Sequence, residues 1–472
     1  MYTPTIGLEI HAELKTKSKM FCGCANDPHN VLPNIHVCPI CMGHPGTLPM
    51  VNLEAVKKTL AFGKAIGAKL ADYSEFDRKN YFYPDIPKAY QLSQYAFPFV
   101  TGGEVLGIAL TRAHLEEDTA RSQHEGHEGS LVNYNRAGVP LLELVTEPVI
   151  QDAKTAVAFA KELQLIFRTL DIADAHMEQG GMRVEANISV SKTGDFGTKV
   201  EVKNLNSFKS VQLAIEYEIE RQIALLENGE EVRQETRGWD EVHLQTFSQR
   251  SKETAKDYRY FPDPDIPKMR ISEQSSFSAD ELNDIVRTLP QEKREKYTLL
   301  GLTRDKIEVI IADTFLDSLF SETKEYRKSD GASKKFITLL ANYLTSDTVS
   351  LLQEKGYPAT VNSKQLASLI HLIQDSKINS RTAKDLLPEV LFVGHDPEKV
   401  ANERGLLQSN NEEDVLIYVK EVISNNSSVV DEYRAGKEEA IQFLVGQGMK
   451  LSKGAANPAM LRDLLQKEIN NL

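Results

Sequence analysis

The chain has 472 residues, of which 41% are hydrophobic and 26% are charged. This composition is typical of a folded globular protein with several domains, and it excludes a small disulfide-stapled scaffold. No run approaches the roughly 18 uninterrupted apolar residues that a membrane-spanning helix needs. The net charge of −13 argues against a surface that coats nucleic acid without sequence preference, but it leaves a local basic groove open.

The first expected element is a strand over residues 5–14. Leu8, Ile10 and further apolar residues alternate with Glu9, His11 and Glu13. Because successive strand side chains point to opposite faces, the two acids and the histidine share one face. No basic or apolar leader precedes this strand, so we expect a cytoplasmic protein.

All four cysteines of the chain fall in the next segment, at Cys22, Cys24, Cys38 and Cys41. They form two close pairs separated by thirteen residues. In a cytoplasmic protein disulfides are disfavoured, and two such pairs supply the four thiolates of a closed, tetrahedral structural zinc site. The spacing therefore predicts zinc bound by the loop 22–41, rather than a redox or catalytic device.

Further along the chain, the expected short strands carry or adjoin hydrogen-bond donors and acidic side chains. Residues 77–81 form a cluster of hydrogen-bond donors that includes Lys79, and residues 116–118 are three adjacent acids. Strands expected over 142–147 and 182–190 again carry polar faces, the second with Arg183, Glu185 and Asn187. A strand from residue 199 ends in a donor-rich turn that contains Lys203 and Asn204.

These polar faces leave two interpretations open. Carboxylates with an imidazole are ligands that hold Mg²⁺ beside a substrate phosphate, and the lysines, arginine and amides suit phosphate oxygens. The same residues are also compatible with a solvated acidic rim. The sequence contains neither a P-loop nor a dinucleotide-binding glycine motif, so a bound nucleotide would have to use a site on the sheet.

Helical periodicity replaces strand patterns near residue 280. Residues 335–344 carry one apolar helix stripe, a polar run at 408–414 is typical of a linker, and Asn457 with Pro458 is typical of a helix start. We predict an α+β fold with three parts: a β-rich module with a polar-lined sheet over 1–285, an all-α module over 286–407, and a small helical tail over 408–472.

Six segments of the β-rich module together carry a family resemblance: residues 7–21, 76–84, 114–118, 135–140, 200–208 and 257–264. The chain resembles the B subunit of the aspartyl/glutamyl-tRNA amidotransferase. Residues 444–458 resemble the small tRNA-contacting tail of that family, so the resemblance covers essentially the whole chain.

The resemblance implies a catalytic cradle that binds tRNA mischarged with glutamate or aspartate. ATP phosphorylates the side-chain carboxylate, and ammonia displaces the phosphate to give Gln-tRNA or Asn-tRNA. The A subunit, an amidase, supplies the ammonia from glutamine, and the small C subunit completes a heterotrimer. Carried onto this sequence, Glu9, His11 and Glu117 would bind Mg²⁺, and the four cysteines would bind the zinc that many members possess.

We expect catalytic residues at Glu9, His11 and Glu117 from the resemblance. From the polar faces and donor-rich segments we add Glu185 and Asn187 as catalytic residues, and Lys79, Arg183, Lys203 and Asn204 as nucleotide-binding residues. For the tail, we expect Lys450 and Lys453 to contact the tRNA backbone. Two alternatives stay open: a non-catalytic, zinc-stabilised tRNA-binding scaffold, and a free-standing metal-dependent hydrolase. The second is disfavoured because the chain offers no convincing amidase nucleophile.

Overall fold

A computed structural model describes residues 2–123, 129–251, 258–327, 333–408, 412–452 and 456–471. It divides into two units, residues 1–290 and 291–472, and each is described by itself. The fold is α+β, as predicted: a β-rich first unit is followed by a second unit whose described elements are helices. Within the described residues, no helix is both long and apolar enough to cross a membrane.

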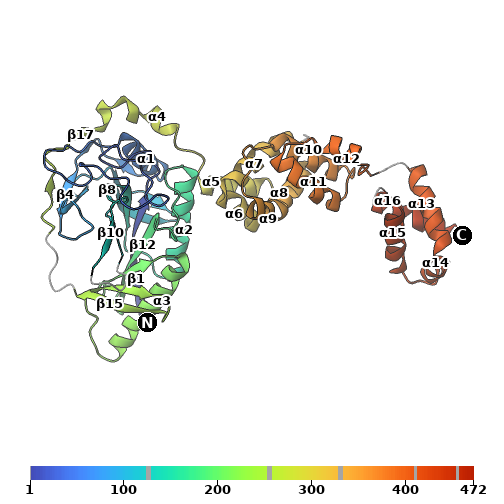
Figure 1. The fold of residues 1–472 in the computed structure, drawn as a ribbon. Coiled ribbons are helices and arrows are strands. Elements are labelled where there is room, and N and C mark those ends of the chain that lie inside the picture. Colours follow the sequence, from blue (N-terminus) through green and yellow to red (C-terminus); the bar gives the residue numbers. More distant parts are fainter. Residues whose placement is uncertain are drawn as a thin grey trace. The chain divides into compact units, whose positions relative to one another are not determined.

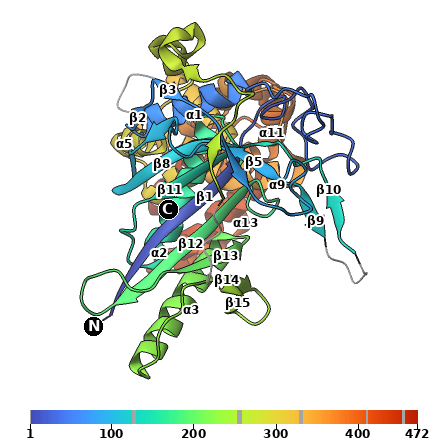
Figure 2. The same cartoon turned by 90° about the vertical axis from the view of Figure 1, so that its left-hand side faces the viewer.

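The first unit is built on a large mixed sheet with the strand order β15-β14-β13-β12-β1-β11-β8-β6-β2, and β7 also pairs with β8. Its central strands are antiparallel, whereas β13 and β14 are parallel. Figure 2 shows β11, β1 and β12 side by side. The bounds are β1 (Thr3–Glu13), β2 (Lys69–Leu70), β6 (Val100–Thr101), β7 (Glu104–Val105), β8 (Ile108–Glu117), β11 (Pro140–Thr146), β12 (Met182–Ser191), β13 (Val200–Leu205), β14 (Glu235–Asp240) and β15 (Gln245–Ser251).

Smaller strands and short helices surround this sheet. They form the ladders β16-β4-β5, β17-β3 and β10-β9. Their bounds are β3 (Tyr73–Ser74), β4 (Asp77–Asn80), β5 (Tyr90–Ser93), β9 (Arg121–Gln123), β10 (Leu131–Asn133), β16 (Phe261–Pro262) and β17 (Met269–Arg270), with 3₁₀ turns at Ile271–Glu273 and Ser275–Phe277 and helix α4 (Ala279–Asn283).

Three helices cover the apolar side of the sheet: α1 (Leu53–Ala65), α2 (Ala153–Thr169) and α3 (Phe208–Glu227). Figure 1 shows α2 and α3 next to the sheet. Leu8 and Ile10 on β1 are completely buried in the core that these helices share with the sheet. As the alternation in residues 5–14 predicts, the apolar side chains face this core, so Glu9 and His11 face the other way.

The second unit is helical. The expected stripe over 335–344 lies in α8 and the first residue of the π-helical turn after it, and Phe336 and Leu340 are completely buried. The expected start at Pro458 is the start of α16, and the side chain of Asn457 caps it. The tail helices share a core of their own that includes Leu461 and Leu465. The predicted division of this half at residue 407 stays a prediction.

The helices of the second unit are α5 (Pro290–Leu299), α6 (Arg304–Ala312), α7 (Thr314–Thr323), α8 (Ser333–Tyr343), α9 (Val349–Lys355), α10 (Ser363–Gln374), α11 (Ser380–Phe392), α12 (Pro397–Glu403), α13 (Glu412–Asn425), α14 (Ser427–Arg434), α15 (Ala440–Leu451) and α16 (Pro458–Asn470). A 3₁₀ turn at Lys324–Tyr326 follows α7, and one turn of π-helix at Leu344–Thr348 links α8 to α9.

Candidate catalytic and metal sites

The central strands place acids and histidines on the face of the sheet that the helices leave free. His11 on β1 lies opposite Glu143 on β11, and Glu143 lies opposite His114 on β8. Glu9 on β1 lies opposite Glu185 on β12. Glu116 follows His114 by two positions and therefore shares its face. We call these residues the acidic cluster: Glu9, His11, His114, Glu116, Glu143 and Glu185.

His11 lies at the centre of the acidic cluster. Its Nε2 atom is 3.4 Å from Glu143 Oε2, 3.7 Å from Glu9 Oε1 and 3.8 Å from Glu116 Oε1. The Nε2 atom of His114 is 3.5 Å from the same Glu143 oxygen. Glu116 and Glu143 are buried. Three carboxylates and two imidazoles thus converge where there is little water to screen their charges.

The acidic cluster fits a bound cation. Two groups of three residues each offer ligand atoms that lie within 4.8 Å of one another. The first group is Glu9, His11 and Glu143, and the second is His114, Glu116 and Glu143. Buried atoms such as Glu116 Oε2 have no hydrogen-bond partner in the described part of the chain. An unpartnered buried carboxylate oxygen is costly, and a divalent cation would satisfy it.

The close approach of these buried charges also shifts the pKa values of the side chains in the acidic cluster. Burial, together with the charges of Glu143 and Glu185, raises the pKa of Glu9 to about 7. Burial and Glu143 also raise the pKa of Glu116 to about 7. Burial lowers the pKa of His11, but the hydrogen bond to Glu143 together with the charges of Glu143 and Glu116 raises it to about 9. Glu9 and Glu116 therefore hold protons more readily than free carboxyl groups, whereas His114 and His11, against the effect of burial, keep the pKa of Glu143 well below its usual range.

A cavity of about 400 Å³ opens beside the acidic cluster, and basic side chains line it. Lys203 Nζ lies 2.7 Å from Glu185 Oε2, and Arg183 Nη2 donates to buried Asp118 at 3.0 Å. Lys79 Nζ lies 5.2 Å from the centre of the Tyr258 ring. All the predicted nucleotide-binding residues line this cavity, together with Glu9, His11 and Glu185. Their individual roles stay predictions.

An irregular strand end brings Lys203 and Asn204 to this cavity. The pairing of β12 with β13 shifts register between Val184 and Ala186, and Asn204 has a φ of 65°. Asparagine tolerates this left-handed conformation better than most residues, and such bulges re-aim side chains next to functional sites. The donor-rich turn expected from the sequence is therefore a bulged strand end facing the cavity.

The structure does not bring Glu117 to the acidic cluster. Glu117 is the neighbour of Glu116 on β8, so its side chain points to the opposite face. There it forms an ion pair with Lys88, and it accepts a hydrogen bond from the backbone N–H of Leu92 at 2.9 Å. The expected set Glu9, His11 and Glu117 is corrected on this point: Glu116 occupies the position beside His11.

The three remaining predicted residues are Asn187, Lys450 and Lys453. Asn187 is half-buried on β12, opposite Gly7, and is not among the residues that line the cavity. Lys450 is exposed near the end of α15. Lys453 lies outside the described residues. The proposed contacts of these two lysines with tRNA stay predictions.

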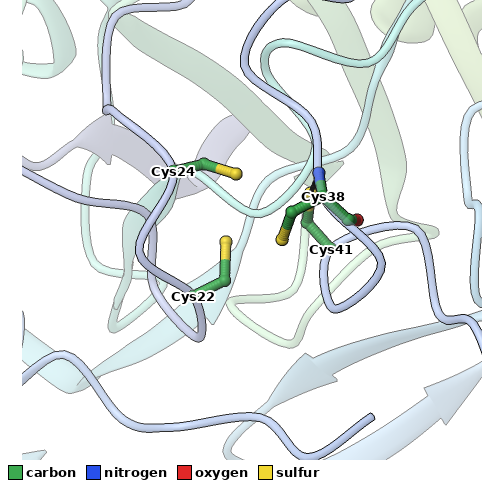
Figure 3. A group of neighbouring side chains, drawn as sticks. All are labelled: Cys22, Cys24, Cys38 and Cys41. Atoms are coloured by element: carbon green, nitrogen blue, oxygen red, sulfur yellow. Dashed lines mark hydrogen bonds between the residues drawn. The ribbon is translucent and has the colours of Figure 1, made fainter.

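The four cysteines come together in the loop between β1 and α1. One sulfur from each of Cys22, Cys24, Cys38 and Cys41 lies within 4.8 Å of the others. Figure 3 shows the first pair facing the second. The backbone N–H of Cys38 donates to the Cys41 sulfur at 3.2 Å. No disulfide joins them, so four thiols are available as ligands, as the spacing predicts.

A second and larger cavity of about 630 Å³ adjoins the first. The two share Arg183 and Asn206, and the larger is also lined by Arg121, Arg136 and His29. Buried Asp118, which lines the smaller cavity, forms ion pairs with Arg136 Nε at 3.2 Å and with Arg183 Nη2 at 3.0 Å. Arginine is well suited to bind phosphate groups, so this cavity favours an anionic ligand.

Sequence reasoning missed four residues of this region as site residues: His114, Glu116, Asp118 and Glu143. One indication was present in the sequence: His114 and Glu116 are two positions apart, so in a strand they lie on the same face. What the sequence lacked was the register that sets Glu143 opposite both His11 and His114.

Residues 4–276 match the family model described as the GatB/GatE catalytic domain, and residues 318–469 match the GatB domain. The chain is 41% identical over 489 residues to the aspartyl/glutamyl-tRNA(Asn/Gln) amidotransferase B subunit of Caldicellulosiruptor saccharolyticus, with all of both chains covered. The corresponding B subunit of Brevibacillus brevis is 40% identical over 486 residues, covering 100% of this chain and 99% of its own. The chain therefore belongs to the family of aspartyl/glutamyl-tRNA(Asn/Gln) amidotransferase B subunits.

Proposed function

We propose that this chain is the component of a glutamine-dependent ligase that activates mischarged tRNA in its acid-lined cavity. The substrates are Glu-tRNA(Gln), Asp-tRNA(Asn) or both, with ATP, and the products are Gln-tRNA and Asn-tRNA. The observation that carries this proposal is the acidic cluster beside a cavity that Lys79, Arg183 and Lys203 also line. Membership of the family supports the reaction type.

The reaction has two steps. An oxygen of the substrate carboxylate attacks the γ-phosphorus of ATP, and ADP leaves with the electrons of the broken P–O bond. Ammonia then attacks the acyl carbon, phosphate departs, and the nitrogen loses a proton to give the amide. Activation is needed because a carboxylate is a poor acyl donor, whereas an acyl phosphate has a good leaving group.

The acidic cluster would hold Mg²⁺ through Glu9, His11 and Glu143, with Glu116 beside them. When bound, Mg²⁺ would reduce the repulsion between ATP and the anionic substrate. Lys79, Lys203 and Arg183 would pair with phosphate oxygens, since all three lie at the same cavity. The buried walls of the cluster limit the access of water, which would hydrolyse the acyl phosphate.

The adjoining arginine-lined cavity would take the anionic acceptor end of the tRNA. The larger cavity shares Arg183 with the acid-lined cavity. The terminal nucleotide of a tRNA bound in the larger cavity would therefore lie next to the carboxylate that reacts in the acid-lined cavity. Arg121 and Arg136 supply the positive charge that a phosphodiester needs. The exposed Lys450 and the neighbouring Lys453 of the tail would add backbone contacts further along the tRNA.

The complete enzyme is a cytoplasmic heterotrimer in this proposal. The amidase partner releases ammonia from glutamine, and the small third partner accompanies it. The four-cysteine loop binds zinc in a structural role, because four thiolates fill a tetrahedral shell and leave no position for substrate.

The test uses the reconstituted heterotrimer and measures ATP hydrolysis stimulated by mischarged tRNA. We expect His11→Ala and Glu143→Gln to abolish stimulated hydrolysis while glutamine hydrolysis by the amidase partner persists. The matched control is Glu147→Gln, since Glu147 follows β11 and accepts a hydrogen bond from Thr111 away from the cavity. Wild-type turnover in both cluster variants would favour the tRNA-binding scaffold instead.

A further inference from the structure

Lys19 is a completely buried lysine in the cysteine-bearing loop, with 0% of its surface exposed. Its Nζ atom donates hydrogen bonds to the carbonyl oxygens of His36 at 2.6 Å and Tyr134 at 3.2 Å. The Cys41 sulfur is its third partner, at 4.0 Å. The ammonium group thus points at the four-cysteine cluster.

Among the residues that the structure describes, this ammonium group has no carboxylate partner. Within the part of the chain that the structure describes, no carboxylate oxygen forms an ion pair with Lys19 Nζ within 4.0 Å. Glu117 lies nearby, since its Oε2 and Lys19 Cδ are both within 4 Å of the position that a Cβ at Gly138 would take. Its negative charge is already paired with Lys88, which contacts the other oxygen, Oε1, as does the Leu92 N–H. Neutral carbonyls satisfy the N–H donors of a buried lysine without balancing its charge, so another anion is needed.

Zinc with four thiolates supplies that anion. One Zn²⁺ and four thiolates carry a net charge of −2, and the Cys41 sulfur already lies beside Lys19. We propose that Lys19 is the counter-cation of the zinc–tetrathiolate centre, so that the bound metal and the buried lysine stabilise each other. This inference rests on the zinc site of the proposed function.

The same contacts link zinc to the segment that precedes β11. Lys19 donates to Tyr134, His36 N–H donates to Asn135 Oδ1 at 2.9 Å, and Met20 N–H donates to Gly138 O at 2.7 Å. The N–H of Gly138 in turn donates to Asp118 O at 2.9 Å. Loss of zinc would therefore loosen the connection between β8 and β11, the two strands that carry His114 and Glu143.

The test compares wild type with Lys19→Met and with the matched control Lys17→Met, since Lys17 is exposed in the same loop. Zinc affinity is measured by chelator competition, and thermal stability is measured with zinc and after chelation. We expect Lys19→Met to weaken zinc binding tenfold or more and to lower Tm only in the zinc-bound protein. After chelation its Tm should equal or exceed that of wild type, and Lys17→Met should match wild type throughout.

An equal loss of Tm with and without zinc would overturn the proposal, because it would mean that Lys19 serves only through its hydrogen bonds. Unchanged zinc affinity would overturn it as well. A wild-type chain that binds no zinc would refute both this inference and the zinc site. The proposed activity would not be affected by that result, because the ATP hydrolysis test decides it independently.

A second measurement needs no variant. Amine labelling of the wild-type protein, read by mass spectrometry, should leave Lys19 unmodified with zinc and modify it after chelation, with Lys17 modified in both states. Labelling of Lys19 that does not respond to chelation contradicts the proposal.

Discussion

Glu116 and Glu117 are neighbours on β8 with opposite surroundings, and replacing each by glutamine separates catalysis from stability. Glu116 lies 3.8 Å from His11 in the acidic cluster, and burial raises its pKa to about 7. Glu117 lies on the other face, paired with Lys88. Glutamine keeps the size of the side chain in both cases, removes the charge and replaces one accepting oxygen by an NH2 donor.

The Glu116→Gln variant should lose activity without losing stability. If the carboxylate helps to hold a metal ion that stabilises transition-state charge, its loss costs roughly 3–4 kcal/mol, or about 10²–10³-fold in turnover. In the metal-free protein, removal of one of several repelling acids should leave Tm unchanged or raise it.

The Glu117→Gln variant should show the reverse pattern. It leaves the buried Lys88 ammonium without its anion, and breaking a buried pair costs roughly 3 kcal/mol or more. At about 2–4 °C per kcal/mol, Tm should fall by about 6 °C or more, while turnover well below Tm stays within a few fold of wild type.

The assay pairs calorimetry of the isolated chain with tRNA-stimulated ATP hydrolysis in the heterotrimer. Loss of turnover in Glu117→Gln together with normal turnover in Glu116→Gln would refute the assignment of strand faces and restore the original Glu9, His11 and Glu117 set.

Three further predictions concern pH, the bulged strand end and the tail. In the metal-free protein the raised pKa of Glu116 favours folding most below about pH 4.5, and that contribution is lost as pH rises through about 7. The Tm of Glu116→Gln minus that of wild type should therefore rise between these pH values. A Tm difference that does not change with pH, measured by calorimetry, would contradict this prediction. Asn204→Gly, at a φ of 65°, should keep Tm within a few degrees and raise the KM for ATP, whereas an unchanged KM would place Asn204 outside the nucleotide site. Lys450→Glu with Lys453→Glu should weaken tRNA binding and reduce the salt slope by about 1.5, and an unchanged slope would remove the tail from the interface.

The sequence predicts those parts of the site that depend on local pattern. Alternation in β1 is enough to place Glu9 and His11 on one face, and the spacing of the cysteines is enough to bring them together. In the run 114–118 local pattern fails, because acids occupy both parities and only pairing with β11 decides that Glu116 faces His11. Lys19 gives no signal at all: it stands in a run of alternating lysines that reads as exposed, yet it is completely buried.

The acids of the acidic cluster repel one another, although the pairing of their strands brings them together. Like charges directly across a strand pair destabilise a sheet, and Glu9 lies opposite Glu185. Register is nevertheless fixed by the other face, where Leu8 and Ile10 are completely buried, and a slip by one residue would turn those side chains to the cavity. The apolar face and its helices thus hold the acids together against their repulsion, and the unsatisfied oxygens that result would favour the divalent cation that we propose for this site.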